Sequence, residues 1–160
     1  MSPRAACRLE SLGFHDVYDY APGKVDWVAA GLPTEGSEAE GPRTGDVAVR
    51  SVPTCHPHDA VSDALAEMDA VGWDSSMVVN ETGVVVGRLY RSDARDADGG
   101  AQVEGIMRPG PSTFRPDVPL DELAGYMRRH DIETAPITTG QGHLVGVALL
   151  DDIEEQLRQL

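Results

Sequence analysis

Apolar and polar positions along this chain follow one order that occurs twice. Each half has a short apolar segment, a helix-like stretch, two apolar runs and a polar stretch that begins a second helix. The first helix-like stretch ends at Val71, and its apolar residues recur at helical spacing: Val61, Leu65 and Met68. The counterpart in the second half covers residues 120–129.

Two apolar runs separated by turn residues follow each helix-like stretch, which is the pattern of a β-hairpin. The predicted strands comprise residues 77–80, 84–89, 135–138 and 144–149. The turn signals between them are Glu81-Thr82-Gly83 and Gly140-Gln141-Gly142. A further short strand is predicted before each helix, near Thr54 and near Thr113.

Equivalent positions in the two halves are 59 residues apart, as for Gly87 and Gly146 and for Asp93 and Asp152. A single unit of an internal repeat is often unable to bury its apolar face alone, so the pair is expected to form one compact object. The order strand, helix, strand, strand, helix, occurring twice, predicts an α/β fold of the α+β type, with small sheets covered by helices.

The residues before the repeats carry a different pattern. Residues 3–12 are predicted to form a helix that Gly13 ends. A strand is predicted at residues 17–20, and a second helix begins at Val25. The chain therefore divides into a helical and extended appendage at 1–36, a linker at 37–43, and two repeats at 44–100 and 101–160.

The formal net charge of −14 disfavours binding to the phosphate backbones of nucleic acids. Hydrophobic residues make up 41% of the 160 residues, which is enough for a core. No stretch approaches the roughly 18 apolar residues of a membrane-spanning helix, and no signal peptide opens the chain. We therefore expect a cytoplasmic protein without nucleic-acid or membrane partners, in which Cys7 and Cys55 are reduced.

The repeated pattern resembles the CBS domain, which occurs as tandem pairs. The matching residues of the second repeat are Thr113, Pro119 to Leu123, Ala135-Pro136-Ile137, His143 to Val147 and Asp151-Asp152. Those of the first are Pro53-Thr54, Ser62 to Met68, Met77 to Val79, Val84 to Gly87 and Asp93. The resemblance implies two β-α-β-β-α repeats packed as a pseudo-twofold module. It also implies two clefts that often bind adenosine nucleotides, and modules that pair into dimers.

The appendage resembles another family, the segment that follows the active-site loop of a rhodanese domain. The matching residues are 2–9, 12–14, 17–20, 23–24, 26–27 and 31–33. In that family the nucleophilic cysteine lies just upstream of this segment, before Met1 of the present chain. Cys7 falls inside the predicted helix and is not its equivalent.

Asp93 and Asp152 are the strongest candidates for ligand binding. The CBS ribose motif ends in an aspartate that accepts two ribose hydroxyls, and both repeats keep its glycine and its aspartate. Tyr90 and Leu149 stand where the motif has Thr or Ser, which removes a hydroxyl contact to phosphate. The alternative is that both aspartates only cap helices. Separately, Ser92 is predicted to cap the short helix that follows the first hairpin.

The resemblance implies a second set of residues that flank the adenine. They are Thr54, Met77 and Val78 in the first repeat, and Thr113, Ala135 and Pro136 in the second. Base contacts at these positions often come from the backbone. The alternative interpretation is that these residues only pack the strands.

Arginines gather near Asp93 in the sequence: Arg88, Arg91 and Arg95. Such a group can hold a phosphate tail, and we include Arg91 among the ligand-binding candidates. The alternative is surface pairing with nearby aspartates, which contributes little. The neighbours of Asp152 are acidic, so the second cleft suits an uncharged adenosine group better than a triphosphate.

Other candidate chemistry is weak. His56 and His58 lack a nearby third ligand, so no metal site is predicted. Cys55 beside His56 could form a nucleophilic pair, but it lies in a predicted strand, and no catalytic residue is assigned.

The sequence therefore predicts a regulatory, non-catalytic protein that requires no cofactor. It is expected to bind an adenosine-containing ligand of the AMP, ADP or ATP class as a homodimer, and to act on an unidentified partner protein. Two alternatives stay open: the C-terminal regulatory piece of a rhodanese-type sulfurtransferase, and a ligand-free protein–protein interaction module.

Overall fold

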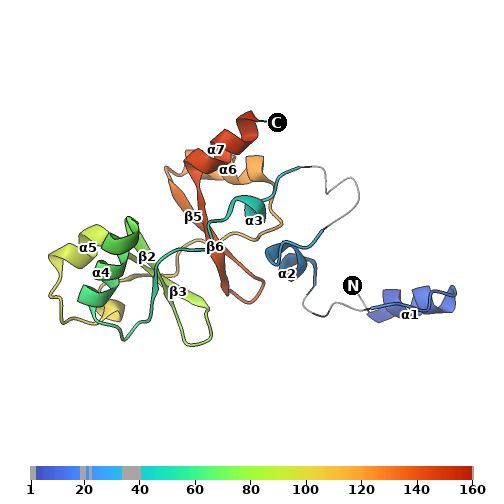
Figure 1. The fold of residues 1–160 in the computed structure, drawn as a ribbon, viewed down its shortest axis with the longest axis horizontal. Helices are drawn as coiled ribbons and strands as arrows, with labels where there is room; N and C mark the ends of the chain where they lie inside the picture. Colours follow the sequence, from blue (N-terminus) through green and yellow to red (C-terminus); the bar gives the residue numbers. More distant parts are fainter. Residues whose placement is uncertain (1–2, 19–20, 22, 34–40, 160) are drawn as a thin grey trace.

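The computed structural model describes residues 3–18, 21, 23–33 and 41–159, with the side chains of residues 3–5 left aside. The first repeat is built on a four-stranded sheet in the order β1-β2-β3-β4, to which the start of the second repeat contributes β4 (Figure 1). Its strands are β1 (Thr54–Cys55), β2 (Ser75–Val79), β3 (Val85–Tyr90) and β4 (Arg108–Pro109). Strand β1 is parallel to β2, and the other neighbours are antiparallel.

The second repeat is built on the hairpin of β5 (Thr134–Thr138) and β6 (Leu144–Leu149). Isolated bridges extend this pair on both sides, Phe114 to Ile137 and Val49 to Val147. The second sheet therefore has the spatial order of the first, although its outer members are single bridges. The hairpins predicted in both repeats are confirmed.

Two helices accompany each sheet (Figure 1). They are α4 (Val61–Val71) and α5 (Arg91–Asp96) in the first repeat, and α6 (Leu120–Arg129) and α7 (Leu150–Arg158) in the second. The predicted apolar stripe of α4 packs into the core through Val61 and Met68, both 0% exposed. The α+β architecture of two repeats follows from this order of elements.

The repeats exchange their opening segments, which we call the lead-in segments. The helix α3 (Thr44–Val47) begins the first repeat, yet Val47 and Ala48 pack on the core of the second. The short 3₁₀-helix η2 (Val103–Gly105) and Met107 lie at the start of the second repeat, and they pack on the core of the first. Each core therefore contains residues from both halves of the chain.

One glycine in each repeat lies where the exchanged segment crosses a strand. A Cβ at Gly146 would lie 2.6 Å from the Val49 carbonyl oxygen, and a Cβ at Gly87 would lie 2.5 Å from the Met107 sulfur. A side chain at position 146 would collide with backbone, and one at position 87 would force the Met107 side chain to move. The glycine of each ribose motif, Gly87 or Gly146, thus has a packing role.

The strand predicted near Thr113 is reduced to the single bridge at Phe114. In the first repeat the Met77 amide donates to the Pro53 carbonyl at 3.0 Å. Pro136 occupies the place of Met77, and proline has no amide hydrogen to donate. The second ladder loses this hydrogen bond and therefore stays shorter.

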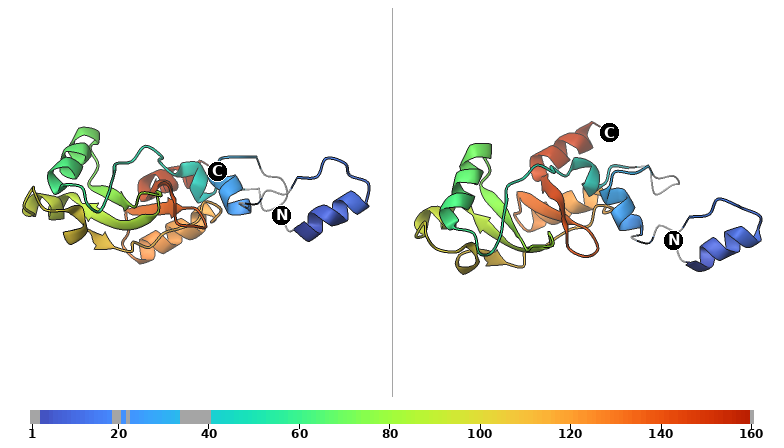
Figure 2. Two further views of the ribbon diagram at one scale, coloured as in Figure 1. Left: turned by 90° about the horizontal axis from the view of Figure 1, so that it is seen from below. Right: turned by 60° about the horizontal axis from the view of Figure 1, so that its bottom comes forward.

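The appendage contains α1 (Pro3–Ser11) and α2 (Lys24–Ala29), close to the predicted helices. Helix α1 lies apart from both repeats in each view (Figures 1 and 2). Helix α2 contacts the lead-in segment, where the Arg50 guanidinium donates to the Ala29 carbonyl at 2.8 Å. Of the strand predicted at 17–20, Val17 and Tyr18 are not in a strand, and Asp19 and Tyr20 lie outside the described residues, as does most of the linker.

Candidate functional site

The two candidate aspartates occupy equivalent places, each in the first turn of the helix that follows a hairpin. Asp93 is the third residue of α5, and Asp152 is the third residue of α7. The N-cap residues are Tyr90 and Leu149, and neither helix has a side-chain cap hydrogen bond among the described residues. Both the capping interpretation and the assignment of Ser92 as N-cap are therefore wrong. We refer to the surroundings of Asp93 as the first site and those of Asp152 as the second site.

The carboxylate of Asp93 is paired with Arg108. The Arg108 guanidinium donates from Nε at 3.1 Å and from Nη2 at 3.4 Å, one bond to each carboxylate oxygen. The side chain of Asp93 is 29% exposed and that of Arg108 is 64% exposed. Sequence reasoning missed this partner because Arg108 belongs to β4, in the segment that leads into the second repeat.

Two guanidinium groups lie near the ring of Tyr90. The Arg88 and Arg108 Cζ atoms lie 4.8 Å and 4.5 Å from its ring centroid. Both distances are within the range of a cation–π interaction. The residue that replaces the hydroxyl of the ribose motif thus contacts two guanidinium groups, and one of them, Arg108, also holds Asp93.

Arg88 connects the two repeats. Its Nε donates to Ser75 Oγ at 3.0 Å, and its other nitrogens donate to the carbonyl and the hydroxyl of Thr134. Burial lowers the pKa of Arg88, because the charged form is partly removed from water. Ser75 and Thr134 are themselves equivalent residues, so one arginine bridges equivalent points of both repeats.

Arg91 and Arg95 do not surround Asp93. The Arg91 guanidinium pairs with Asp69 at 2.7 Å and donates to the carbonyls of Met68 and Trp73 at the end of α4. Arg95 also approaches Asp69, at 3.4 Å. The arginine cluster predicted from the sequence is thus divided, and Arg88 and Arg108 are the cations closest to Tyr90.

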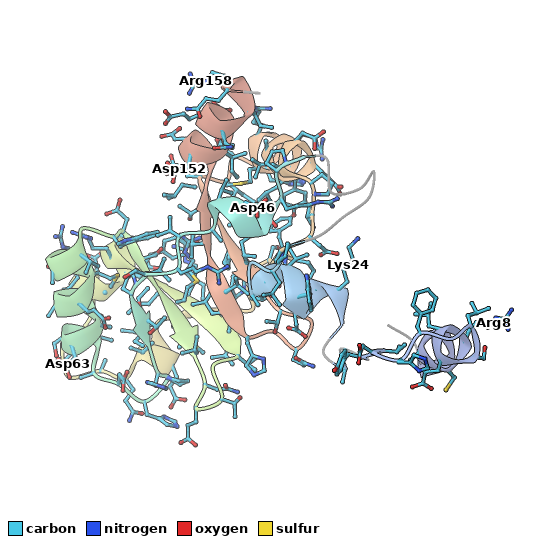
Figure 3. All side chains as sticks on the ribbon, turned by 45° about the vertical axis from the view of Figure 1, so that its right-hand side comes forward. Arg8, Lys24, Asp46, Asp63, Asp152 and Arg158 are labelled. Atoms are coloured by element: carbon cyan, nitrogen blue, oxygen red, sulfur yellow. The ribbon has the colours of Figure 1, made fainter. Side chains whose placement is uncertain are left out.

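The second site has a different character. Asp152 is exposed at the start of α7 (Figure 3), and within the described part of the chain it makes no ion pair. The counterparts of Arg88, Tyr90 and Arg108 are aliphatic: Val147, Leu149 and Val49. The second carboxylate is therefore accessible and has no guanidinium beside it.

Most of the adenine-flanking candidates lie in strands, and Thr113 directly precedes the bridge at Phe114. Thr54 is opposite Met77 in the parallel pair of β1 and β2, and Thr54 is exposed. The side chains of Met77 and Val78 are 2% and 0% exposed, so contacts to a ligand there depend on the backbone.

In the second repeat, Ala135 and Pro136 are buried in β5 and Thr113 is exposed. Because Pro136 has no amide hydrogen, it can offer a base only its carbonyl group. That carbonyl already accepts the Phe114 amide at 2.9 Å. The backbone contacts available to a base therefore differ between the two sites.

The structure offers little to metal or thiol chemistry. Among the described residues, no three His, Cys, Asp or Glu side chains gather into a metal-binding group. Cys55 is 4% exposed, and burial raises the pKa of its thiol, which opposes the thiolate that a nucleophile needs. Nor is any helix in the described ranges long and apolar enough to cross a membrane.

Comparison with known families supports the repeat structure. The family model described as "CBS domain" matches residues 45–100 and again residues 103–158. These two matches include both candidate aspartates and both exchanged lead-in segments.

Several known proteins resemble this chain. Homoserine O-acetyltransferase of Methanococcoides burtonii is 28% identical over 147 residues, which are 91% of this chain and 29% of that enzyme. The cytosolic domain of the Mg²⁺ channel MgtE in complex with ATP has a TM-score of 0.67 and 25% identity, covering 71% of this chain and 48% of that one. CBSX2 of Arabidopsis thaliana in complex with AMP has a TM-score of 0.66 and 19% identity, covering 74% and 98%. The chain spans less than a third of the curated relatives that it matches.

Proposed function

This chain belongs to the CBS domain family, with one repeat in each half, and on that premise we propose that it is a non-catalytic regulatory module that binds an adenosine-containing ligand. The ligand class is AMP, ADP or ATP, bound in clefts between the repeats, and no cofactor is required. Ligand binding shifts the population between two packings of the repeats and so alters a partner protein.

The observation that carries this proposal is the equivalent placement of Asp93 and Asp152. Each carboxylate follows a hairpin, is not used as a helix cap and reaches the surface. Asp152 is able to accept two ribose hydroxyls as it stands, and Asp93 is able to do so once Arg108 releases it. The MgtE domain and CBSX2, which resemble this chain, are known in complex with ATP and with AMP. These likenesses support an adenine nucleotide as the ligand.

The other residues of the proposed sites are those assigned to the adenine. Thr54, Met77 and Val78 flank the adenine of the first site. Thr113, Ala135 and Pro136 do so in the second. The sequence made Arg91 a candidate for ligand binding. Its ion pair with Asp69 favours a role in holding α5 against α4 instead.

Further parts of the proposal concern organisation. We assign the repeats to residues 44–100 and 101–160, a homodimer as the working form, and the cytoplasm as its location. The rhodanese-like interpretation of residues 1–36 stays a prediction, because the family matches begin at residue 45.

Isothermal titration calorimetry of the whole chain with AMP, ADP and ATP tests the proposal, with GMP as a control for base recognition. We expect saturable binding of at least one adenine nucleotide and weaker binding of GMP. The stoichiometry shows whether one site or both are occupied. If none of the adenine nucleotides binds, the proposal is wrong and the ligand-free interaction module becomes the better account.

A further inference from the structure

The two sites differ most in the residues beside the aspartate. In the first site, Arg88 and Arg108 lie over Tyr90, and Arg108 also holds Asp93. The equivalent positions of the second site carry two valines and a leucine. The chain carries a net charge of −14, so two neighbouring guanidinium groups form an unusual positive region. This region favours binding of an anion.

The hydrogen-bond geometry separates the contributions of the two arginines. Arg88 uses most of its donors on Ser75 and Thr134, so it contributes positive charge near the Tyr90 ring rather than a free hydrogen-bond donor. Its guanidinium has no carboxylate partner among the described residues, and its charge is therefore not neutralised locally. Arg108 directs Nε and Nη2 at Asp93 and is largely exposed, which leaves Nη1 available to a ligand.

The ion pair between Asp93 and Arg108 controls access to the ribose position. Ribose hydroxyls must donate to the oxygens of Asp93 that Arg108 now occupies. An uncharged nucleoside that displaces Arg108 leaves the guanidinium without a counterion. A phosphorylated ligand gives Arg108 a new partner, and a guanidinium can bind phosphate through two parallel hydrogen bonds.

We propose that Arg108, supported by Tyr90 and Arg88, makes the first site selective for phosphate-bearing nucleotides, whereas the second site does not distinguish them from uncharged adenosine. Arg108 moves from Asp93 to the phosphate when the ligand binds, and Asp93 is thereby freed for the ribose. This inference rests on the proposed function, because it specifies the ligand class of one of its two sites.

The test uses the full chain with Asp152→Asn, so that binding reports on the first site. Titration calorimetry compares AMP, adenosine and inorganic tripolyphosphate, with and without Arg108→Gln. We expect AMP to bind about tenfold or more tightly than adenosine, because a charge-assisted contact to phosphate has roughly that effect. Arg108→Gln removes this preference. It also strengthens adenosine binding by up to about fivefold, because an exposed ion pair no longer competes for Asp93.

Arg128→Gln is the matched control. Arg128 forms an exposed ion pair with Glu154 at 2.8 Å, so this variant removes the same charge and a similar contact in the other repeat. It should leave the preference for AMP unchanged. Thermal melts of all variants confirm that each one is folded.

The outcomes separate this inference from the proposed function. Equal binding of AMP and adenosine that Arg108→Gln leaves unaltered overturns the inference and leaves the proposed function standing. Tripolyphosphate binding that depends on Arg108, without binding of any nucleotide, supports the phosphate site and contradicts the adenosine ligand. Failure of all three compounds to bind overturns both.

Discussion

Val84 of the first repeat lies opposite His143 of the second in an antiparallel bridge, and these two residues are equivalent positions of the repeat. The Val85 amide donates to the Gly142 carbonyl at 3.0 Å, and the Leu144 amide donates to the Gly83 carbonyl at 3.1 Å. Exchanging the repeats converts one bond into the other. The two hairpins therefore meet across a local twofold axis, and the lead-in segments are exchanged about the same axis.

The exchanged packing makes Gly146 more sensitive to substitution than Gly87. A methyl group at position 146 meets the Val49 backbone, which cannot rotate away, whereas one at position 87 mainly meets the flexible Met107 side chain. We expect Gly146→Ala to lower the free energy of unfolding by about 1–3 kcal/mol, and Gly87→Ala by less. Urea denaturation of both variants measures the difference. An equal or larger loss for Gly87→Ala would contradict this account of the crossing.

Arg88 is expected to stabilise the contact between the repeats. Replacing it with Met leaves the hydroxyl of Ser75, which is 4% exposed, without its donor. The free energy of unfolding should fall by about 1–3 kcal/mol. Arg129→Met, which changes an exposed side chain, should have an effect within about 0.5 kcal/mol.

A double-mutant cycle isolates the bond between Arg88 and the second repeat. Thr134→Val removes the hydroxyl that accepts from Arg88. The two substitutions should be non-additive, with an interaction energy of about 0.5 kcal/mol or more. Strict additivity would mean that Arg88 does not couple the repeats.

Ionisation of Cys55 should destabilise the fold at high pH. Burial raises the pKa of this thiol above its ordinary value of 9.0, and a hydrogen bond from Ser76 only partly offsets that effect. The stabilisation from the neutral buried thiol is therefore fully present at pH values below the ordinary pKa of the thiol. It is lost as the pH rises through the higher pKa of the folded state. Between about pH 8 and pH 10, the native chain should lose more unfolding free energy than Cys55→Ala.

Cys7 provides the control for this titration, because its side chain is exposed on α1. Cys7→Ala should retain the pH dependence of the native chain. If Cys55→Ala and the native chain have parallel profiles, the buried thiol does not contribute.

Much of the fold could be predicted from the sequence because the apolar pattern is local and occurs twice. The 59-residue step located both hairpins, the helices α4 and α6, and the pair Asp93 and Asp152. The shortened strand near Thr113 could also have been anticipated, since Pro136 stands in the sequence where an amide donor is needed.

The contacts around Asp93 could not be predicted, because they join distant segments. Arg108 reaches Asp93 only because β4 pairs with β3, whereas sequence proximity favoured Arg91 and Arg95. Both of these arginines turn towards Asp69 on α4. The exchange of lead-in segments likewise results from packing between the repeats. The apolar pattern within one repeat therefore could not predict it.

Adenine-nucleotide binding through the two aspartates is the central claim, and a thermal-shift panel tests it most directly. The panel compares AMP, ADP, ATP and S-adenosylmethionine on the native chain, Asp93→Ala and Asp152→Ala. A ligand at a hundredfold excess over its Kd adds about 2.7 kcal/mol of stability, which raises the Tm of a chain this size by several degrees. We predict such a shift for at least one ligand, and its loss in one of the two variants. No shift with any of the four ligands, or a shift that both variants retain, would contradict the claim.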